Sequence, residues 1–321
     1  MRARWSEPGD AEALAALAER WGSVFVTPAW TAQFGDTART VALVDEGERP
    51  VGGLVVREER RFGLTVCRNL PASPSCGPFL EVTASNPVVV QSRAKEAMTA
   101  LAAFLGDRGY ALSTLSFDRR WRDLQPLVWA GWQVSPTYTY LLDLGLGEDA
   151  LWERLSSDRR KAVRKAWKDG VTVHETDDPE RVLALVQRTF ERQGKGYDRD
   201  AVRRVLHGFL APGRGFARVA ARMGRDLAAV FCLIDRDTAI YLAGGYDAEH
   251  RHAGAGAAAM WEAIRHARAL GLATFDFEGS SVPAIEQYFR GFGGTLVDGA
   301  RATRGWLPVE LALKVLRRRL T

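Results

Sequence analysis

The segment FDFEGSSVPAIEQYFRGFGG (residues 275–294) runs from a strand through a turn into a helix that ends in glycines. Its first residues read as the end of a buried strand, and Pro283 suits the first turn of the helix that follows. The glycines at the end of the segment are a usual stop signal for a helix. This order of strand, turn, helix and Gly-Phe-Gly-Gly indicates an α/β fold.

The same order of elements occurs twice along the chain. Strand–turn–strand patterns, in which short apolar runs flank a polar turn, are expected at 39–59 and at 215–235. A helix with apolar residues three to four positions apart follows each pattern, at 92–109 and at 256–271. A further strand and helix follow in each half. We therefore predict one α/β unit used twice, offset by about 160 residues.

Glycines mark equivalent points in the two halves. The predicted helices end at Gly109 and Gly271. The interval from Gly109 to Gly131 equals the interval from Gly271 to Gly293. Two generic α/β halves could share an order of elements by chance, but the shared spacing favours a repeat.

The length and composition suit two globular domains. The chain has 321 residues, of which 46% are hydrophobic and 26% charged, so each half can bury a sizeable core. The glycine-punctuated segment 142–150 predicts a join there, with domains at 1–144 and 145–321. We find no signal peptide, no apolar run of about 20 residues and no CxxC pair. We therefore expect a cytoplasmic protein without a membrane span, a disulfide framework or a metal site.

Positive charge is concentrated in the second half. Residues 1–144 carry 15 Lys/Arg and 16 Asp/Glu, a net charge of −1, and residues 145–321 carry 29 and 23, a net charge of +6. A phosphate-bearing or polyanionic ligand is expected to bind the second half. An arginine-rich surface without any ligand is the alternative.

A glycine-rich loop could hold phosphate groups. The sequence RHAGAG (251–256) lies between a predicted strand and the 256–271 helix. Gly254 and Gly256 would let backbone N–H groups approach a pyrophosphate at the positive end of the helix, and Arg251 would bind a phosphate oxygen. An alanine- and glycine-rich helix start without a ligand is the alternative.

A tyrosine stands on one face of the last predicted helix. Ala284, Tyr288 and Phe292 recur every four residues and share that face. The pattern resembles the last helix and strand of the GNAT acyltransferase fold. This resemblance implies that the Tyr288 hydroxyl lies near the leaving group. The first half has Leu124 and Val128 at the equivalent places and has no R-x-x-G-x-G loop, so we expect a degenerate copy there.

Tandem GNAT-like halves with one active copy resemble the FemABX superfamily and the related BioF2-like acetyltransferase domains. The resemblance covers essentially the whole chain and is strongest at 156–171, 246–280 and 285–294. Fem-like relatives typically have Asp-Phe-Gly-Gly where this chain has DFEG (276–279). The departure introduces Glu278 at a strand end. It could remove a proton from an acceptor amine, or it could be a solvated turn residue.

A basic helix is predicted within 156–171. Five cations share an arc of about 140° on this helix, opposite its apolar side: Arg160, Lys161, Arg164, Lys165 and Lys168. The Fem-like resemblance implies that they lie near tRNA or the acceptor, although a solvated face would look the same. Phe289 and Arg290 are expected to contact the substrate, and Lys195 and Tyr197 could line the same cleft.

The function predicted from these features is N-acyl transfer, in which an amine attacks an activated acyl carbonyl. The Fem-like resemblance implies aminoacyl-tRNA as donor and a peptidoglycan precursor or another peptide as acceptor. The glycine loop implies acyl-CoA instead, with a small amine or sugar amine as acceptor. We expect no metal, no DNA partner and a monomer.

A protein without catalytic activity that binds RNA or another polyanion through the basic face is the third possibility. The sequence shows no stripe in which basic and aromatic residues alternate, as single-strand binders have. We therefore favour the enzyme, with aminoacyl-tRNA as its donor.

Overall fold

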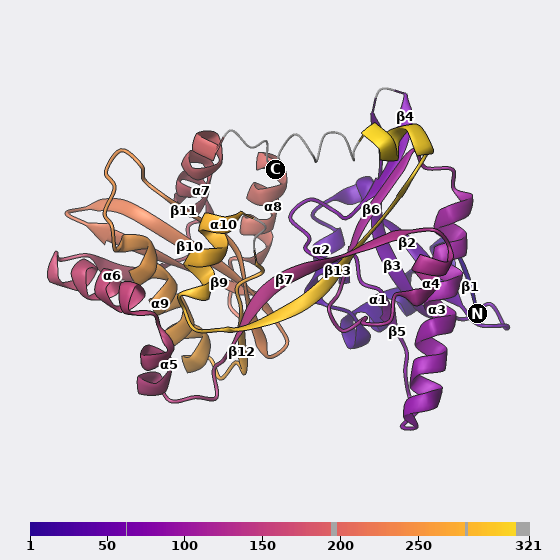
Figure 1. Cartoon of the computed structure of the whole chain (residues 1–321), viewed down its shortest axis with the longest axis horizontal. Helices are drawn as coiled ribbons and strands as arrows, with labels where there is room; N and C mark the ends of the chain where they lie inside the picture. The colour runs from indigo at the N-terminus through magenta and orange to yellow at the C-terminus, as the bar shows by residue number, and fades with distance from the viewer. Residues whose placement is uncertain (62, 194–197, 280–281, 313–321) are drawn as a thin grey trace. The chain divides into compact units, whose positions relative to one another are not determined.

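The structure is a computed structural model that describes residues 1–61, 63–193, 198–279 and 282–312 (Figure 1). The chain forms two compact units. The first unit contains Met1–Thr137 together with the chain from Asp298 onward, and the second contains Tyr138–Val297. The division predicted at 144/145 differs from this one, because the end of the chain returns to the first unit.

The first unit is a sheet with the strand order β1-β2-β3-β4-β6-β13, in which β5 pairs with β3. The strand pairs are antiparallel except β4 and β6, which run parallel. Its strands are β1 (Arg2–Trp5), β2 (Arg39–Val44), β3 (Pro50–Arg61), β4 (Leu64–Arg68), β5 (Phe79–Leu80), β6 (Leu112–Phe117) and the end of β13 (Thr295–Gly305). Its α-helices are α1 (Ala11–Trp21), α2 (Pro28–Thr31), α3 (Pro87–Asp107) and α4 (Gln125–Trp129).

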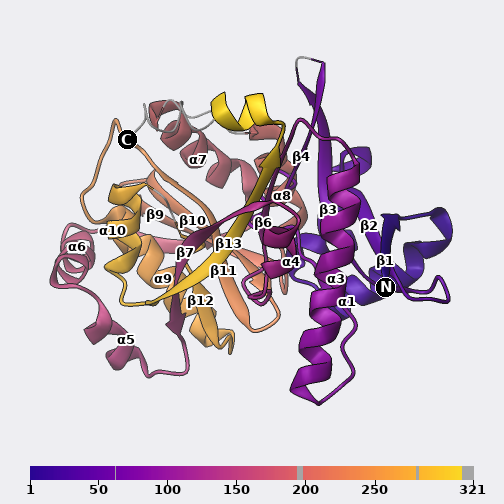
Figure 2. The ribbon, with the colours of Figure 1, turned by 45° about the vertical axis from the view of Figure 1, so that its right-hand side comes forward.

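Strand β2 is buried on both faces. Val41 and Leu43 join a cluster that contains Met98 and Leu101 of α3, and Ala42 and Val44 are also fully buried. This explains its continuous apolar sequence, because a strand covered on both sides has no reason to alternate. Helix α3 packs against β1 and β2 (Figure 2).

The second unit has the strand order β7-β12-β11-β10-β9-β8. The parallel pair here is β11 and β12. The strands are β7 (Gln133–Asp143), whose end lies in this unit, β8 (Thr172–Thr176), β9 (Gly215–Arg222), β10 (Arg225–Asp235), β11 (Thr238–Tyr246) and β12 (Thr274–Asp276). The helices are α5 (Glu148–Arg154), α6 (Ser157–Lys168), α7 (Pro179–Gln193), α8 (Arg199–Phe209), α9 (Ala255–Ala269) and α10 (Pro283–Arg290).

The predicted repeat is confirmed, down to its glycines. Gly109 and Gly271 follow α3 and α9 with φ of 65° and 78°. Gly131 and Gly293 follow α4 and α10 with φ of 81° and 80°. All four are in the left-handed region, where glycine has no Cβ penalty. Because Gly131 matches Gly293, Pro126 rather than Val128 stands five residues before the glycine, as Tyr288 does.

The last strand of each half is exchanged. The first half ends in β7, but β7 pairs with β12 of the second unit, through Leu141–Asp143. The second half ends in β13, and residues 300–305 of β13 pair with β6 of the first unit. Each sheet is therefore completed by a strand from the other half of the sequence.

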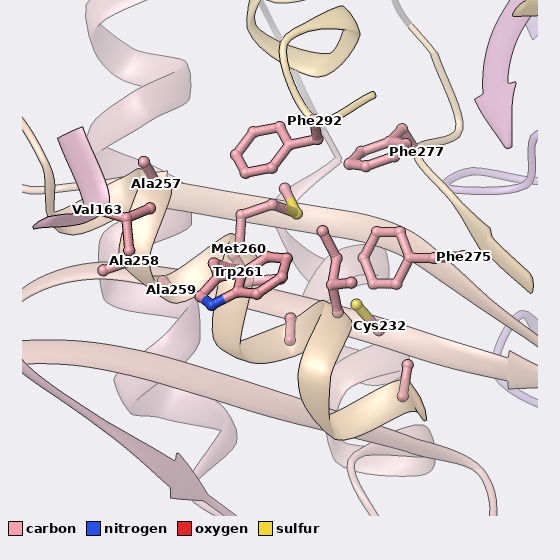
Figure 3. Close-up of a cluster of buried hydrophobic side chains, with 14 of the residues drawn as sticks. Val163, Cys232, Ala257, Ala258, Ala259, Met260, Trp261, Phe275, Phe277 and Phe292 are labelled. Carbon is pink, nitrogen blue, oxygen red and sulfur yellow. The ribbon is translucent and has the colours of Figure 1, made fainter. Parts of the chain in front are cut away.

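Helix α9 forms the centre of the second unit's core (Figure 3). Three consecutive alanines, Ala257–Ala259, are buried at its start, and their small side chains let the helix approach its neighbours closely. Trp261 of the next turn and Phe277 and Phe292 beyond the helix complete the core. Among the described residues, no helix is long and apolar enough to cross a membrane.

Candidate active site

Strands β11 and β12 pair over a short distance only. Their parallel register covers Thr238–Ile240 against Thr274–Asp276, after which β12 ends and β11 continues. β11 stays paired with β10 on its other side, with a register shift at Cys232. Beyond Ile240, the described part of the chain gives β11 no strand partner on the β12 side. The first residue past this point is Tyr241.

Tyr288 of α10 lies next to the start of α9. Its ring packs against Phe292 at 5.2 Å between centroids. A Cβ built on Gly256 would lie 3.7 Å from the Tyr288 hydroxyl oxygen. The amides of Gly256 and Ala257, in the first turn of α9, have no hydrogen-bond acceptor within the described ranges. The Tyr288 hydroxyl therefore lies near Gly256, in the first turn of α9, which is the positive end of that helix.

Both tyrosines of this region remain protonated at neutral pH. Burial raises the pKa of Tyr288 well above its ordinary value, and the cation of Arg159 opposes that rise. Burial also raises the pKa of Tyr241, and Tyr288 and Glu278 add to the increase. The two tyrosine rings both pack against Phe289, at 5.4 and 5.8 Å between centroids. Sequence reasoning missed Tyr241, whose signal was a hydroxyl-bearing residue within the apolar run AIYLAGG (239–245).

Arg159 is the second functional candidate that sequence reasoning missed. Its guanidinium carbon lies 4.6 Å from the centre of the Tyr288 ring and 6.0 Å from that of Phe292. The side chain passes over Gly291, where an added Cβ would lie 2.9 Å from the Arg159 Cγ and Nε atoms. Its Nε atom is buried and has no hydrogen-bond partner among the described residues. Arg159 lies outside the cationic arc that the helical projection predicted.

Glu278 has a backbone conformation that favours glycine. Its φ is 60°, and its N–H donates to Asp276 Oδ1 at 2.8 Å. Asp276 is 4% exposed and also accepts a hydrogen bond from Thr139 Oγ1 at 2.7 Å. A left-handed φ explains why a glycine suits this position in Fem-like sequences. The exposed carboxylate is therefore kept here at a backbone cost of about 1–3 kcal/mol.

Part of the glycine loop packs against helix α6 of the same unit. A Cβ on Gly254 would lie 2.1 Å from the carbonyl oxygen of Ala162, so this glycine lets α6 and α9 approach. The Gly254 N–H donates to His252 Nδ1 at 3.1 Å, and His252 Nε2 contacts Asp169 Oδ2 at 3.0 Å. This geometry assigns Gly254 to helix packing rather than to ligand approach. Arg251 is exposed and makes no contact with a described acid.

The basic helix forms as predicted and buries Val163 and Ala166 completely. Of its five cations, Arg160 donates to the carbonyl oxygens of Glu153 and Leu155, at 2.8 and 2.9 Å. Lys165 pairs with Asp169 at 2.8 Å, and the Arg164 guanidinium lies 5.4 Å from the Trp152 ring centre. The two that remain exposed and without a partner in the described part of the chain are Lys161 and Lys168.

The residues beside Tyr288 have structural neighbours. Phe289 is 4% exposed and packs against Tyr241 at 5.4 Å, which assigns it to the core rather than to substrate contact. Arg290 is exposed and pairs with Glu286 at 3.2 Å. Lys195 and Tyr197 lie outside the described residues.

The comparison with known families agrees with this geometry. Residues 155–290 match the family described as acetyltransferase (GNAT) domain. This segment is a GNAT domain. It contains Arg159, the glycine loop, Glu278 and Tyr288, so the predicted acyltransferase class is confirmed.

Solved structures share the whole tandem architecture of the GNAT fold. FemX is 16% identical, with a TM-score of 0.64 over 94% of this chain and 97% of FemX. The C-terminal domain of a putative lysylphosphatidylglycerol synthetase from Agrobacterium fabrum is 11% identical, with a TM-score of 0.60 over 96% of each chain. A tandem GNAT protein from the clavulanic acid biosynthesis pathway is 13% identical, with a TM-score of 0.54 over 94% and 98%. No curated protein sequence matches this chain. The expected FemABX-like tandem GNAT fold is confirmed.

Proposed function

We propose that the second unit transfers an acyl group to an amine at the end of β12, between α9 and α10. The observation that carries this proposal is the protonated Tyr288 hydroxyl near Gly256, in the first turn of α9. All named site residues belong to Tyr138–Val297, so one copy of the chain is sufficient.

The proposed reaction uses positioning, backbone donors and a proton donor. The amine nitrogen forms a C–N bond with the acyl carbon, and the bond from that carbon to the leaving oxygen or sulfur breaks. The Gly256 and Ala257 amides stabilise the oxyanion that develops. Tyr288 gives its proton to the leaving atom, and Glu278 takes a proton from the amine.

Arg159 is proposed to bind the donor and to orient the Tyr288 ring. Its position over the Tyr288 ring fixes that ring, and its charge opposes the effect of burial on the tyrosine pKa. We propose that its guanidinium binds an anionic group of the donor.

We propose aminoacyl-tRNA as donor, used in the cytoplasm, and a peptide amine such as that of a peptidoglycan precursor as acceptor. Two considerations support this donor. FemX and the putative lysylphosphatidylglycerol synthetase share the tandem architecture across nearly their whole length. Gly254, which would have opened the loop to a CoA pyrophosphate, faces Ala162 of α6 instead. Acyl-CoA remains the second candidate, because the α9 amides and Arg251 could still bind phosphate.

One parallel assay separates these donors. Purified protein is incubated with candidate amines and either labelled aminoacyl-tRNA or labelled acetyl-CoA. We expect transfer from the tRNA pool that RNase abolishes and that Arg159→Gln lowers more than Arg159→Lys does. Transfer from acetyl-CoA alone would overturn the donor, and no transfer from either, together with RNA binding, would leave a binding protein.

A further inference from the structure

Two tryptophans form a stack on the surface of the second unit. Trp152 of α5 and Trp167 of α6 lie 5.5 Å apart with 14° between their planes. Trp152 also packs edge-on against Trp261, which is 2% exposed, at 5.2 Å. Trp167 remains 45% exposed. An exposed ring is thus held rigidly by the core of the domain.

One cation contacts this stack, two more lie on the adjacent face of α6, and two of the nearby acids are already paired. The Arg164 guanidinium lies over Trp152, and the Lys161 and Lys168 side chains are exposed. Asp169 is paired with Lys165 and His252, and Glu153 with Arg160. Asp158, in the first turn of α6, lies at the opposite end of the helix from Trp167. Asp149, one turn before Trp152 on α5, is also exposed. Lys161, Arg164 and Lys168 outnumber Asp149 and Asp158, so the local charge that remains is positive.

Trp167 lies between Lys165 and Lys168 in the sequence, but its stacking partner Trp152 belongs to another helix, so the stack itself could not be predicted. We propose that the surface formed by Trp152, Lys161, Arg164, Trp167 and Lys168, the tryptophan platform, binds unpaired nucleotides at the end of the RNA donor. A base stacks on the open face of Trp167, and the phosphates contact Lys161 and Lys168. This inference rests on the proposed function and names how its donor is held.

The length of α6 fits this assignment. Arg159 lies over Tyr288 at one end of the helix, and Trp167 is eight residues further along. At about 1.5 Å per residue this separation is about 12 Å along the axis. Three to four stacked nucleotides at about 3.4 Å each cover that distance. A nucleotide chain that stacks on Trp167 can therefore carry its acyl ester to the Tyr288 hydroxyl.

The first test measures binding without catalysis. A 5′-labelled single-stranded RNA that ends in CCA is titrated with the full chain by fluorescence anisotropy. We expect Trp167→Ala to weaken binding about tenfold and Trp167→Phe to keep most of it, since phenylalanine still offers a ring. The matched control is Trp129→Ala, because Trp129 is 68% exposed and lies 4.9 Å from Lys95 Nζ in the first unit. The proposal would be overturned if Trp129→Ala and Trp167→Ala weakened binding by the same factor.

The second test separates stacking from charge. Lys161→Gln and Lys168→Gln should each lower the slope of log K against log salt by about 0.7, whereas Trp167→Ala should leave the slope unchanged. If the protein binds no RNA, the assignment of the tryptophan platform is overturned. It is also overturned if CoA or anionic phospholipid vesicles, rather than RNA, bind in a way that depends on Trp167. RNA binding with no aminoacyl transfer keeps the platform and removes the proposed function. Aminoacyl transfer whose KM is unaffected by Trp167→Ala removes the platform alone.

Discussion

The two units differ beyond the point where their parallel strand pair ends. In the first unit, the pairing of the parallel strands β4 and β6 ends at Arg68 and Thr114. Beyond that point, residues of the following loop form hydrogen bonds with β6. Asn69 Nδ2 donates to the Ser116 carbonyl at 3.1 Å, and Asn69 Oδ1 accepts from the Ser116 N–H at 3.0 Å. The Cys76 N–H also donates to the Ser116 carbonyl, at 3.0 Å. Side-chain and loop atoms thus complete the edge of β6.

In the second unit β12, the counterpart of β6, ends at Asp276, and the described residues give β11 no strand partner on that side from Tyr241 onward, although the Tyr246 N–H donates to Thr189 Oγ1 at 3.0 Å. The first turns of the equivalent helices α3 and α9 also differ, in whether a side chain caps them. In α3, Asn86 caps its own helix by accepting the Val88 N–H at 2.9 Å, whereas Gly254 offers α9 no side chain as a cap. A unit that satisfies its own polar groups has no need of a ligand, and one that leaves them open requires a ligand or water. This difference supports the proposal that the second unit holds the active site.

The largest expected effect removes the proposed acid. Tyr288→Phe should lower kcat about 100-fold or more, with an unchanged urea midpoint, because only a hydroxyl is lost. The matched change in the first unit is Tyr110→Phe, which removes a hydroxyl bonded to Glu58 at 2.5 Å and should leave kcat unchanged. Steady-state rates and urea unfolding of both variants measure this contrast. Full activity in Tyr288→Phe would confine the residue to packing.

The next effect concerns the two glycines of the loop. Gly254→Val should destabilise the second unit by about 3 kcal/mol, since its side chain would collide with the Ala162 carbonyl. Gly256→Ala should keep the stability, because its Cβ would make an ordinary 3.7 Å contact with the Tyr288 oxygen. Urea midpoints distinguish the two. A stable Gly254→Val that loses only CoA binding would return this glycine to a phosphate cradle.

A smaller loss of stability is expected at Asn69, whose side chain completes the edge of β6 in the first unit. Asn69→Ala should cost about 2 kcal/mol, because the Ser116 N–H would lose its half-buried acceptor. Asn86→Ala, which removes only the α3 cap, should cost about 1 kcal/mol. Neither change should alter acyl transfer. A rate lowered by Asn69→Ala at unchanged stability would give the first unit a part in catalysis.

The smallest effect is the contribution of one histidine of the second unit to the dependence of stability on pH. All five histidines lie between positions 174 and 266. Burial lowers the pKa of His266, and the Arg218 guanidinium, which donates to His266 Nδ1, lowers it further. Between the lowered pKa and the ordinary 6.5 the unfolded chain binds more protons, so stability falls as the pH falls through this window. Unfolding of His266→Gln should show a flatter profile there, and an identical profile would exclude this histidine as the source.

Much of the fold and part of the site could be predicted from the sequence alone. Local chemistry determined the α/β order, the repeat and the glycines that end each helix, because strand and helix periods and left-handed turns are written in neighbouring residues. The same local signals identified the apolar side of α6 through Val163 and Ala166. The motif around Tyr288 identified the tyrosine next to the first turn of α9.

Tertiary structure alone decided which residues meet. The exchange of β7 and β13, the position of Arg159 over Tyr288 and the stack of Trp152 on Trp167 each join residues from separate elements. Gly254 likewise gained its role from α6, which lies far from it in the sequence. Periodicity states which face of an element is buried but not what it is buried against. The partner is selected by packing and hydrogen bonding over the whole domain.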